Sequence, residues 1–190
     1  MFKKISLLAV MALSVIAMAA PVAKAEWLHN GAQLEYISEI PLTGNIKFVA
    51  PNGFGSFECH VSTSISASPG NLGTVMSFTP RTSTCVGVGF LFSKCKLKSH
   101  LTTLPWAAVA ITDIISPYVA ITNATIHYVY EGCSSGTTTS HFMFPVIKAT
   151  PDNHNAISSF SLSGTATNGA VVSGTLEVTG GAPGTYGIST

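Results

Sequence analysis

The chain has 190 residues, of which 46% are hydrophobic and only 9% are charged, whereas ordinary globular proteins carry about 25% charged residues. Three of its nine lysines and arginines lie in the first 25 residues, so the remainder has six basic and eight acidic residues and a formal charge of −2. This composition excludes the basic field that nucleic-acid binding needs, and its weak charge repulsion favours contacts between molecules.

Residues 1–25 have the pattern of a secretory signal. Lys3 and Lys4 precede an apolar run, and Ala23-Lys24-Ala25 places small residues where a signal peptidase cuts. We therefore expect a mature chain that starts at Glu26 and is exported to the periplasm, the cell surface or the exterior. Its 165 residues suffice for one domain with a sizeable core. We expect no transmembrane segment after cleavage.

The segment 26–51 is predicted to be either a first strand or an N-terminal arm that pairs with another molecule, because prolines and a glycine interrupt it. Residues 52–190 then form a single domain. From Phe57 to Ser68 apolar and polar residues alternate, which is typical of a half-buried strand. A turn leads into a second strand, Thr74 to Phe78, which stops at Pro80.

Four cysteines in an exported chain predict two disulfides. Three pairings are possible, and we favour Cys85 with Cys95 across a Gly-rich loop and Cys59 with Cys133 between an early and a late strand. Zinc binding is the competing role for four cysteines. No C-x-x-C pair occurs, however, so we expect no metal site.

The residues after the Gly-rich loop alternate as in a strand. One face carries Lys94, Lys96, Lys98 and His100, and the other carries Cys95, Leu97, Ser99 and Leu101. The lysines form a basic stripe, interpreted as a solvated strand face or as an anion-binding site. Pro105 ends the strand, and Trp106 is predicted to be a core residue beside a disulfide.

The second half of the chain predicts further strands. Tyr118 to Tyr130 is a long strand, residues 134–140 are a small-polar loop, and residues 142–147 are a short strand. In the last hairpin, a three-residue loop Thr167–Gly169 pairs Phe160 with Leu176 and keeps the apolar residues on one face. A Gly-rich tail follows from Gly180. The whole pattern predicts an all-β, disulfide-stapled antiparallel β-sandwich, with a barrel-like double sheet as the alternative.

Short motifs along the mature chain resemble those of one protein family. They are Leu42-Thr43-Gly44, Glu58-Cys59, Ser77-Phe78-Thr79-Pro80, Leu104-Pro105-Trp106, Thr125-Ile126-His127, Gly132-Cys133, Leu162-Ser163-Gly164-Thr165, Ser173-Gly174-Thr175 and Gly184-Thr185-Tyr186-Gly187-Ile188, with Cys85 and Cys95. The chain resembles the PraB-like "protein activator of alkane oxidation" family of small secreted bacterial proteins, most of them uncharacterised. The resemblance implies a role at cell surfaces, hydrocarbon interfaces or biofilm, and it brings no catalytic residues.

Enzymatic interpretations find little support in the sequence. No G-x-S-x-G motif occurs, and the acids Glu58, Asp113 and Glu131 are more simply read as solvated carboxylates than as a glycosidase pair. The histidines His60, His127 and His141 show no metal-binding spacing. We expect no enzyme, no cofactor and no metal.

The leading hypothesis is an exported surface or matrix protein that self-associates through strand edges or its N-terminal arm. A pilin-like subunit is a variant of this hypothesis. The alternative is a monomeric module that binds a lipid, hydrocarbon or glycan in a pocket. The candidate lining or interface residues are Trp27, Trp106, Tyr128 and Tyr130.

Overall fold

All strand pairs are antiparallel in the part of the chain that the computed structural model describes, residues 25–51, 55–89, 93–113, 116–133, 136–180 and 185–190. The predicted signal lies outside this part, except for Ala25. The strands are β1 (Trp27–His29), β2 (Ala32–Gln33), β3 (Ser38–Val49), β4 (Ser56–Ala67), β5 (Leu72–Pro80), β6 (Val86–Val88), β7 (Lys96–Thr102), β8 (Trp106–Ile111), β9 (Tyr118–Cys133), β10 (Gly136–Pro151), β11 (Ser159–Thr165), β12 (Val171–Val178) and β13 (Tyr186–Ile188). A 3-10 turn, η2, spans Thr82–Thr84.

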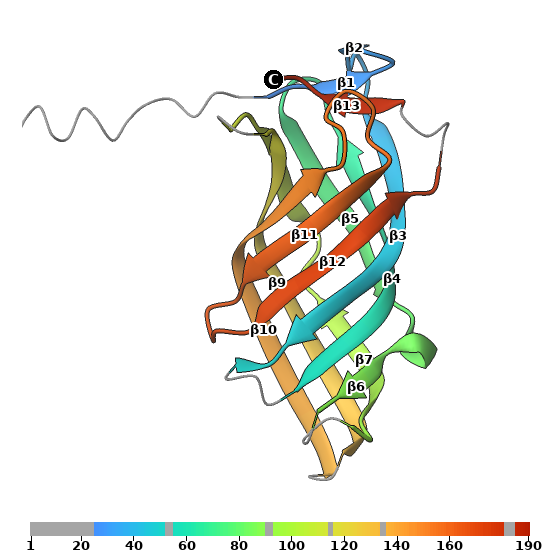
Figure 1. Cartoon of the computed structure of the whole chain (residues 1–190), viewed down its shortest axis with the longest axis vertical. Coiled ribbons are helices and arrows are strands. Elements are labelled where there is room, and N and C mark those ends of the chain that lie inside the picture. The colour runs from blue at the N-terminus through green and yellow to red at the C-terminus, as the bar shows by residue number, and fades with distance from the viewer. Residues whose placement is uncertain (1–24, 52–54, 90–92, 114–115, 134–135, 181–184) are drawn as a thin grey trace, which may run out of the picture.

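Eight of these strands close into a barrel in the order β10-β11-β12-β3-β4-β5-β8-β9, because β9 pairs back onto β10. Figure 1 shows the tilted strands wrapping around one long axis. The all-β, antiparallel prediction is confirmed. The sandwich is wrong, and the barrel alternative is the closer description, because the sheet returns to its own first strand instead of forming two separate layers.

Between β4 and β9 the barrel wall is built in two levels. Nearer β1 and β13, the wall is completed by β5 and β8, which we call the upper rung. Nearer the opposite end, it is completed by β6 and β7, the lower rung. Strand β9 changes neighbour from β7 to β8 around Asn123, which has a left-handed φ of 55°. Asn tolerates this conformation better than most residues.

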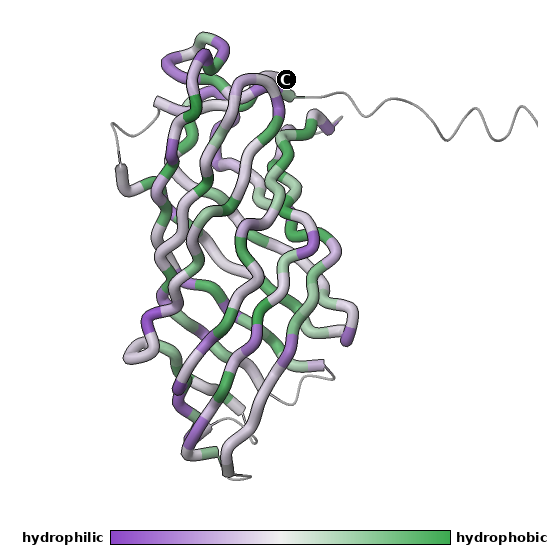
Figure 2. Tube along the Cα trace, turned by 180° about the vertical axis from the view of Figure 1, so that it is seen from behind, coloured by the Kyte–Doolittle hydropathy of each residue, from purple (hydrophilic) through white to green (hydrophobic). Residues whose placement is uncertain are grey.

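Buried and exposed residues alternate along most strands, and Figure 2 shows the hydropathy changing along the backbone. In β4, the inward residues are Phe57, Cys59, Val61, Ile65 and Ala67, all buried, which confirms the predicted alternation. Inward residues from β3, β9, β10, β11 and β12 complete one continuous apolar core. Burial of this apolar surface is the main stabilising contribution to the fold.

Two glycines let neighbouring strands approach closely in the wall β12–β3–β4. Gly44 and Gly174 occupy inward positions of β3 and β12. A Cβ atom at Gly44 would fall on the carbonyl oxygen of Thr175, and one at Gly174 on that of Asn45. Glycine at such positions allows the strong coiling that a small barrel requires.

The segment predicted to be an arm or first strand is a strand of the barrel itself. β3 pairs over its whole length with β4 and over most of it with β12, so the segment packs in its own chain. Pro41 is tolerated because it lies where the pairing with β12 has ended, at Leu42. Trp27 in β1 is only 1% exposed. β1 pairs with β13 and β2 in a small sheet across the upper end of the barrel.

The disulfides join Cys59 to Cys85 and Cys95 to Cys133. All four cysteines are bonded as predicted, but the favoured pairing is wrong. Cys85 precedes β6 and bonds to β4, whereas Cys95 precedes β7 and bonds to the end of β9. The two bonds therefore tie the lower rung to the barrel strands on both of its sides.

Three local predictions have different outcomes. The register of the last hairpin is confirmed, with Phe160 opposite Leu176 and Gly169 at φ 84°. The loop predicted at 134–140 is wrong from Gly136 onward, where β10 begins; residues 134–135 lie outside the described residues. The predicted tail is also partly wrong, since Tyr186–Ile188 form β13 and are buried.

Candidate functional site

A pocket opens through the side of the barrel between the β3–β4 turn and the strand β10, with a volume of about 220 Å³. We call it the lateral pocket. Four aromatic side chains line it, one from each of four strands: Phe48 of β3, Phe57 of β4, Tyr130 of β9 and Phe142 of β10. Its other lining residues are Ala50, Pro51, Gly55, Ser56, Thr139, Ser140, His141 and Asn168. An aromatic wall with a polar rim is typical of small-molecule sites.

The aromatic wall is tightly packed. The rings of Phe57 and Tyr130 stack with centroids 4.1 Å apart, and those of Phe48 and Phe142 with centroids 5.7 Å apart. Tyr128 meets Phe48 edge-on at 5.3 Å. Such aromatic pairs contribute roughly 0.5–1.5 kcal/mol each beyond their buried area. The wall is therefore a preformed surface.

Above the lateral pocket the barrel interior contains an apolar cavity of about 30 Å³. Side chains from around the barrel line it, including Phe48, Phe78 and Trp106. Phe48 lines both the cavity and the lateral pocket, so the two spaces share this side chain. The cavity alone has room for little more than a water molecule.

Three buried polar atoms within the described residues have no hydrogen-bond partner: Trp27 Nε1, Trp106 Nε1 and the Tyr128 hydroxyl. Leaving a buried donor unpaired costs roughly 1–3 kcal/mol. Burial raises the pKa of Tyr128 well above its ordinary value, and the neighbouring Tyr130 raises it further. Burial likewise raises the pKa of Tyr130, although a hydrogen bond with the Ser140 side chain lowers it. Both tyrosines are neutral phenols at physiological pH.

The structure brings some of the predicted pocket residues together. Tyr130 lines the lateral pocket, and Tyr128 packs against Phe48 and Phe142 of the same wall. Trp106 lines the cavity and packs against Phe78, with ring centroids 5.4 Å apart. It is buried as predicted and lies in the upper rung, whereas the disulfides join the lower rung to β4 and β9. Trp27 lies in the sheet at the upper end, apart from the pocket.

The predicted basic stripe is exposed, and the charge of one of its lysines is compensated by an acidic residue. Lys94, Lys96 and Lys98 are all exposed, and Lys98 forms an ion pair with Glu131 at 3.6 Å. A register shift between Leu97 and Ser99 reverses the alternation that the sequence predicted beyond this point. As a result, Leu101 is 68% exposed, although it was predicted to share a face with the buried Leu97.

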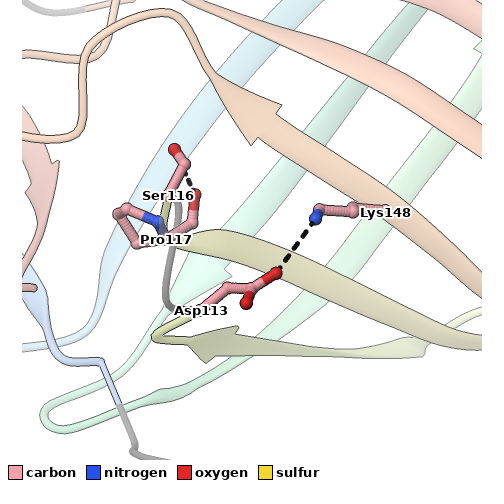
Figure 3. Close-up of polar contacts among 4 residues, drawn as sticks. All are labelled: Asp113, Ser116, Pro117 and Lys148. Atoms are coloured by element: carbon pink, nitrogen blue, oxygen red, sulfur yellow. Dashed lines mark hydrogen bonds and ion pairs between the residues drawn. The ribbon is translucent and has the colours of Figure 1, made fainter.

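The acidic residues considered as a catalytic pair lie apart on the outer surface. Glu131 pairs with Lys98 of the lower rung, whereas Asp113, after β8, pairs with Lys148 of β10 at 3.6 Å (Figure 3). The Lys148 ammonium group also lies 4.2 Å from the centroid of the Tyr118 ring. Both ion pairs are exposed, and such pairs contribute about 0–1 kcal/mol.

A polar groove on the outside of β12, β3 and β4 was not predicted. It has a volume of about 580 Å³ and is lined by residues that include Lys47, Glu58, His60 and Glu177. The His60 ring makes hydrogen bonds with Thr43 Oγ1 at 2.9 Å and with Asn45 Oδ1 at 3.1 Å. Gly44 and Gly174 also line the groove.

The histidines considered as metal ligands lie at two separate locations. His127 and His141 are partners across β9 and β10, and their rings stack with centroids 4.0 Å apart. His60 lies on β4 with its own hydrogen-bond partners. In the described ranges, no three or more His, Cys, Asp or Glu side chains converge as a metal-binding group.

The chain matches no protein-family model, and no curated protein or solved structure matches it at a significant level. Among the described residues there is also no helix long and apolar enough to cross a membrane. The two disulfides are bonds that persist in oxidising compartments, such as the periplasm or the cell exterior.

Proposed function

We propose that this protein is an exported β-barrel that binds a small, mainly apolar molecule in the lateral pocket. The observation that supports the proposal is the aromatic wall of this pocket, in which Phe48 also lines the apolar cavity of the barrel interior. The interpretation as a binding module for a hydrocarbon or lipid-like ligand is supported more directly than strand donation, because the segment 26–51 is occupied within its own barrel.

The size of the pocket limits the ligand. An enclosed apolar cavity of about 150 Å³ is enough to bind benzene in another protein, and the lateral pocket measures about 220 Å³. Drug-sized ligands occupy sites of roughly 300–1,000 Å³. The expected ligand therefore has the size of a substituted benzene or a short alkyl chain. A displacement of Phe48 would add the interior cavity to the site.

The Tyr128 hydroxyl suggests one polar requirement. It is buried without a partner among the described residues, and its ring packs against the aromatic wall. A ligand with one hydrogen-bond acceptor, such as a ketone or ester oxygen, would satisfy this donor and remove the cost of leaving it unpaired. The preferred ligand is thus an apolar molecule with a single oxygen acceptor.

Export rests on the predicted signal at residues 1–25 and agrees with the two disulfides. The resemblance to PraB-like proteins, associated with hydrocarbon interfaces, also supports an apolar ligand. No step of covalent chemistry is proposed, and the site needs no cofactor for this role.

The test measures ligand-induced stabilisation of the mature, disulfide-bonded protein with toluene and 2-heptanone as probes. Binding to the folded state raises the melting temperature as probe concentration rises. The variant Ala50→Trp fills the lateral pocket and should abolish the shift. Its control, Ala107→Trp, adds the same side chain at an exposed position of β8 and should keep the shift. Equal shifts in both variants, or none in the wild type, would overturn the proposal.

A second candidate function is self-association as a surface or matrix protein. The observation in its favour is that β10 pairs with β11 only from Ile147 onward, so no described strand lies beside residues 137–141 on the side of the lateral pocket. A strand edge of this kind can accept a strand from another molecule.

Light scattering behind a sizing column tests this second candidate. Assemblies that disappear in Thr139→Lys, but persist in the control Thr175→Lys at an exposed position of β12 that is paired on both sides, would support association through β10. A monomer at all concentrations would exclude it and leave the binding proposal untouched.

A further inference from the structure

We propose that His127, His141 and Met143 form a copper(I) site on the outer face of the β9–β10 ribbon. The site is independent of the proposed function, although His141 also lines the rim of the lateral pocket. All three side chains are exposed. An ion from solution therefore reaches them without any change in the barrel.

The two imidazoles are placed at a separation that one metal ion spans. His127 and His141 are opposite each other in the ladder, and their rings lie nearly parallel, 13° apart, with centroids at 4.0 Å. Imidazole nitrogens bind transition metals at about 2.0–2.1 Å, so two ligands of one ion stand up to about 4 Å apart. Small rotations of two exposed side chains bring one nitrogen of each ring onto the ion.

Met143 supplies a third ligand of a different kind. It lies two residues beyond His141 on the same strand and therefore faces the same side. It is also a diagonal neighbour of His127, within reach of a long side chain. Its side chain is 45% exposed, which is high for a methionine that only fills a core.

The turn after β11 holds the backbone of this cluster. Thr167 N–H donates to the carbonyl oxygen of Met143 at 2.8 Å, and the Asn168 side-chain amide donates to that of His141 at 3.1 Å. These contacts fix the spacing of the two β10 ligands. A fixed spacing lowers the entropic cost of binding, because the ligands need not be gathered by the metal.

The donor set selects the metal. Thioether sulfur is a soft ligand that favours copper(I), and imidazole binds copper as well as zinc. The neighbouring outward residues on the two strands are Thr125, Val129 and Thr139, none of which is cationic. The cluster thus has two nitrogen donors and one sulfur donor, and neither these neighbours nor Leu101, the partner of His127 on β7, is cationic.

The experiment titrates the mature, oxidised protein with copper(I), supplied anaerobically as its acetonitrile complex, in competition with a chromophoric copper(I) chelator. We expect one copper ion per chain. His127→Gln and His141→Gln should each lower the affinity about tenfold or more, because the second imidazole then no longer acts at high effective concentration. Met143→Leu should lower copper(I) affinity about fivefold while leaving zinc(II) affinity unchanged.

The chain provides matched controls. Met76→Leu and His60→Gln make the same substitutions at Met76 of β5 and His60 of β4, and both should bind copper(I) like the wild type. In NMR spectra, only the ring resonances of His127 and His141 and the methyl resonance of Met143 should shift with the first equivalent. Undiminished binding by a His127→Gln/His141→Gln double variant would overturn the proposal, as would equal losses in Met76→Leu and Met143→Leu.

Discussion

The wall β12–β3–β4 and the lower rung β6–β7 close the same barrel by different means. β3 and β4 are paired at twelve positions in unbroken register, from Ser38 with Ala67 to Val49 with Ser56. β6 and β7 share only the pair Val86 with Lys96. The first region is held by its ladders alone, whereas the second pairs with β4 at three positions and with β9 at six, and adds a disulfide to each of these strands. Covalent bonds supplement strand pairing where the ladders are short.

Removing one disulfide of the lower rung should destabilise the protein more than any other change considered below. The bond Cys59–Cys85 spans 26 residues and Cys95–Cys133 spans 38. Loop closure of this size stabilises by about 3 to 4 kcal/mol in the chain-entropy model. The paired variant Cys59→Ala/Cys85→Ala should lose about this much unfolding free energy in chemical denaturation, without leaving a free thiol.

Hydrogen exchange in this variant distinguishes the two regions. Amides of β6 and β7 should exchange much faster, while those at the centre of β3 keep protection up to the lower global stability. If β3 lost protection before β6, the lower rung would not depend on its disulfide, and the contrast between the two regions would fail.

A smaller loss of stability is expected from a substitution in the wall β12–β3–β4. In Gly44→Ala the added Cβ would fall on the Thr175 carbonyl oxygen, so the two strands must separate. We expect a loss of about 2–3 kcal/mol of unfolding free energy. The control is Gly70→Ala, where nothing lies within 4 Å of the added atom and only the φ of 84° is unfavourable, for a cost of roughly 1 kcal/mol.

Two adjacent inward tyrosines of β9 should respond in opposite directions. Tyr128→Phe removes a buried hydroxyl without a partner and should stabilise the ligand-free protein by about 1 kcal/mol. Tyr130→Phe removes a hydroxyl that is hydrogen-bonded with Ser140 and should destabilise it by about 1 kcal/mol. Thermal unfolding of both variants measures the difference.

The Tyr128→Phe variant also tests the proposal that the ligand has one hydrogen-bond acceptor. Tyr128→Phe should weaken binding of 2-heptanone more than that of toluene, since only the ketone accepts a hydrogen bond. A Tyr128→Phe variant less stable than the wild type would show that its hydroxyl is satisfied in the folded protein.

Local features were predicted well where a short pattern determines the structure. The hairpin of β11 and β12 followed from Asn168-Gly169 and the period-two apolar residues, because only one register keeps Phe160 and Leu176 on the same face. β3 was harder to recognise, because Pro41 and Gly44 look like interruptions. Both residues have places in the barrel that depend on the partner strand β12.

Features that depend on distant neighbours were not predictable in this way. The disulfide pairing follows from which barrel strands flank the lower rung, and no spacing along the chain contains that information. The residues 136–140 look like a loop because they are small and polar. They form a strand because β9 supplies the ladder. The lateral pocket arises from the same arrangement, since it lies between this strand and a turn far away in sequence.

The smallest expected effect concerns His100 of β7, which links the lower rung to β5. Burial lowers the pKa of His100 below its ordinary value of 6.5, although a hydrogen bond with the Phe78 backbone partly raises it. A lowered pKa means that the unfolded chain binds the proton more tightly, so the associated stability is complete above pH 6.5 and is lost as pH falls through the folded pKa. The unfolding free energy of the wild type should therefore fall more steeply below pH 6.5 than that of His100→Gln. An NMR titration placing the His100 pKa above 6.5 would reverse this sign, and would mean that contact with β5 favours the charged ring.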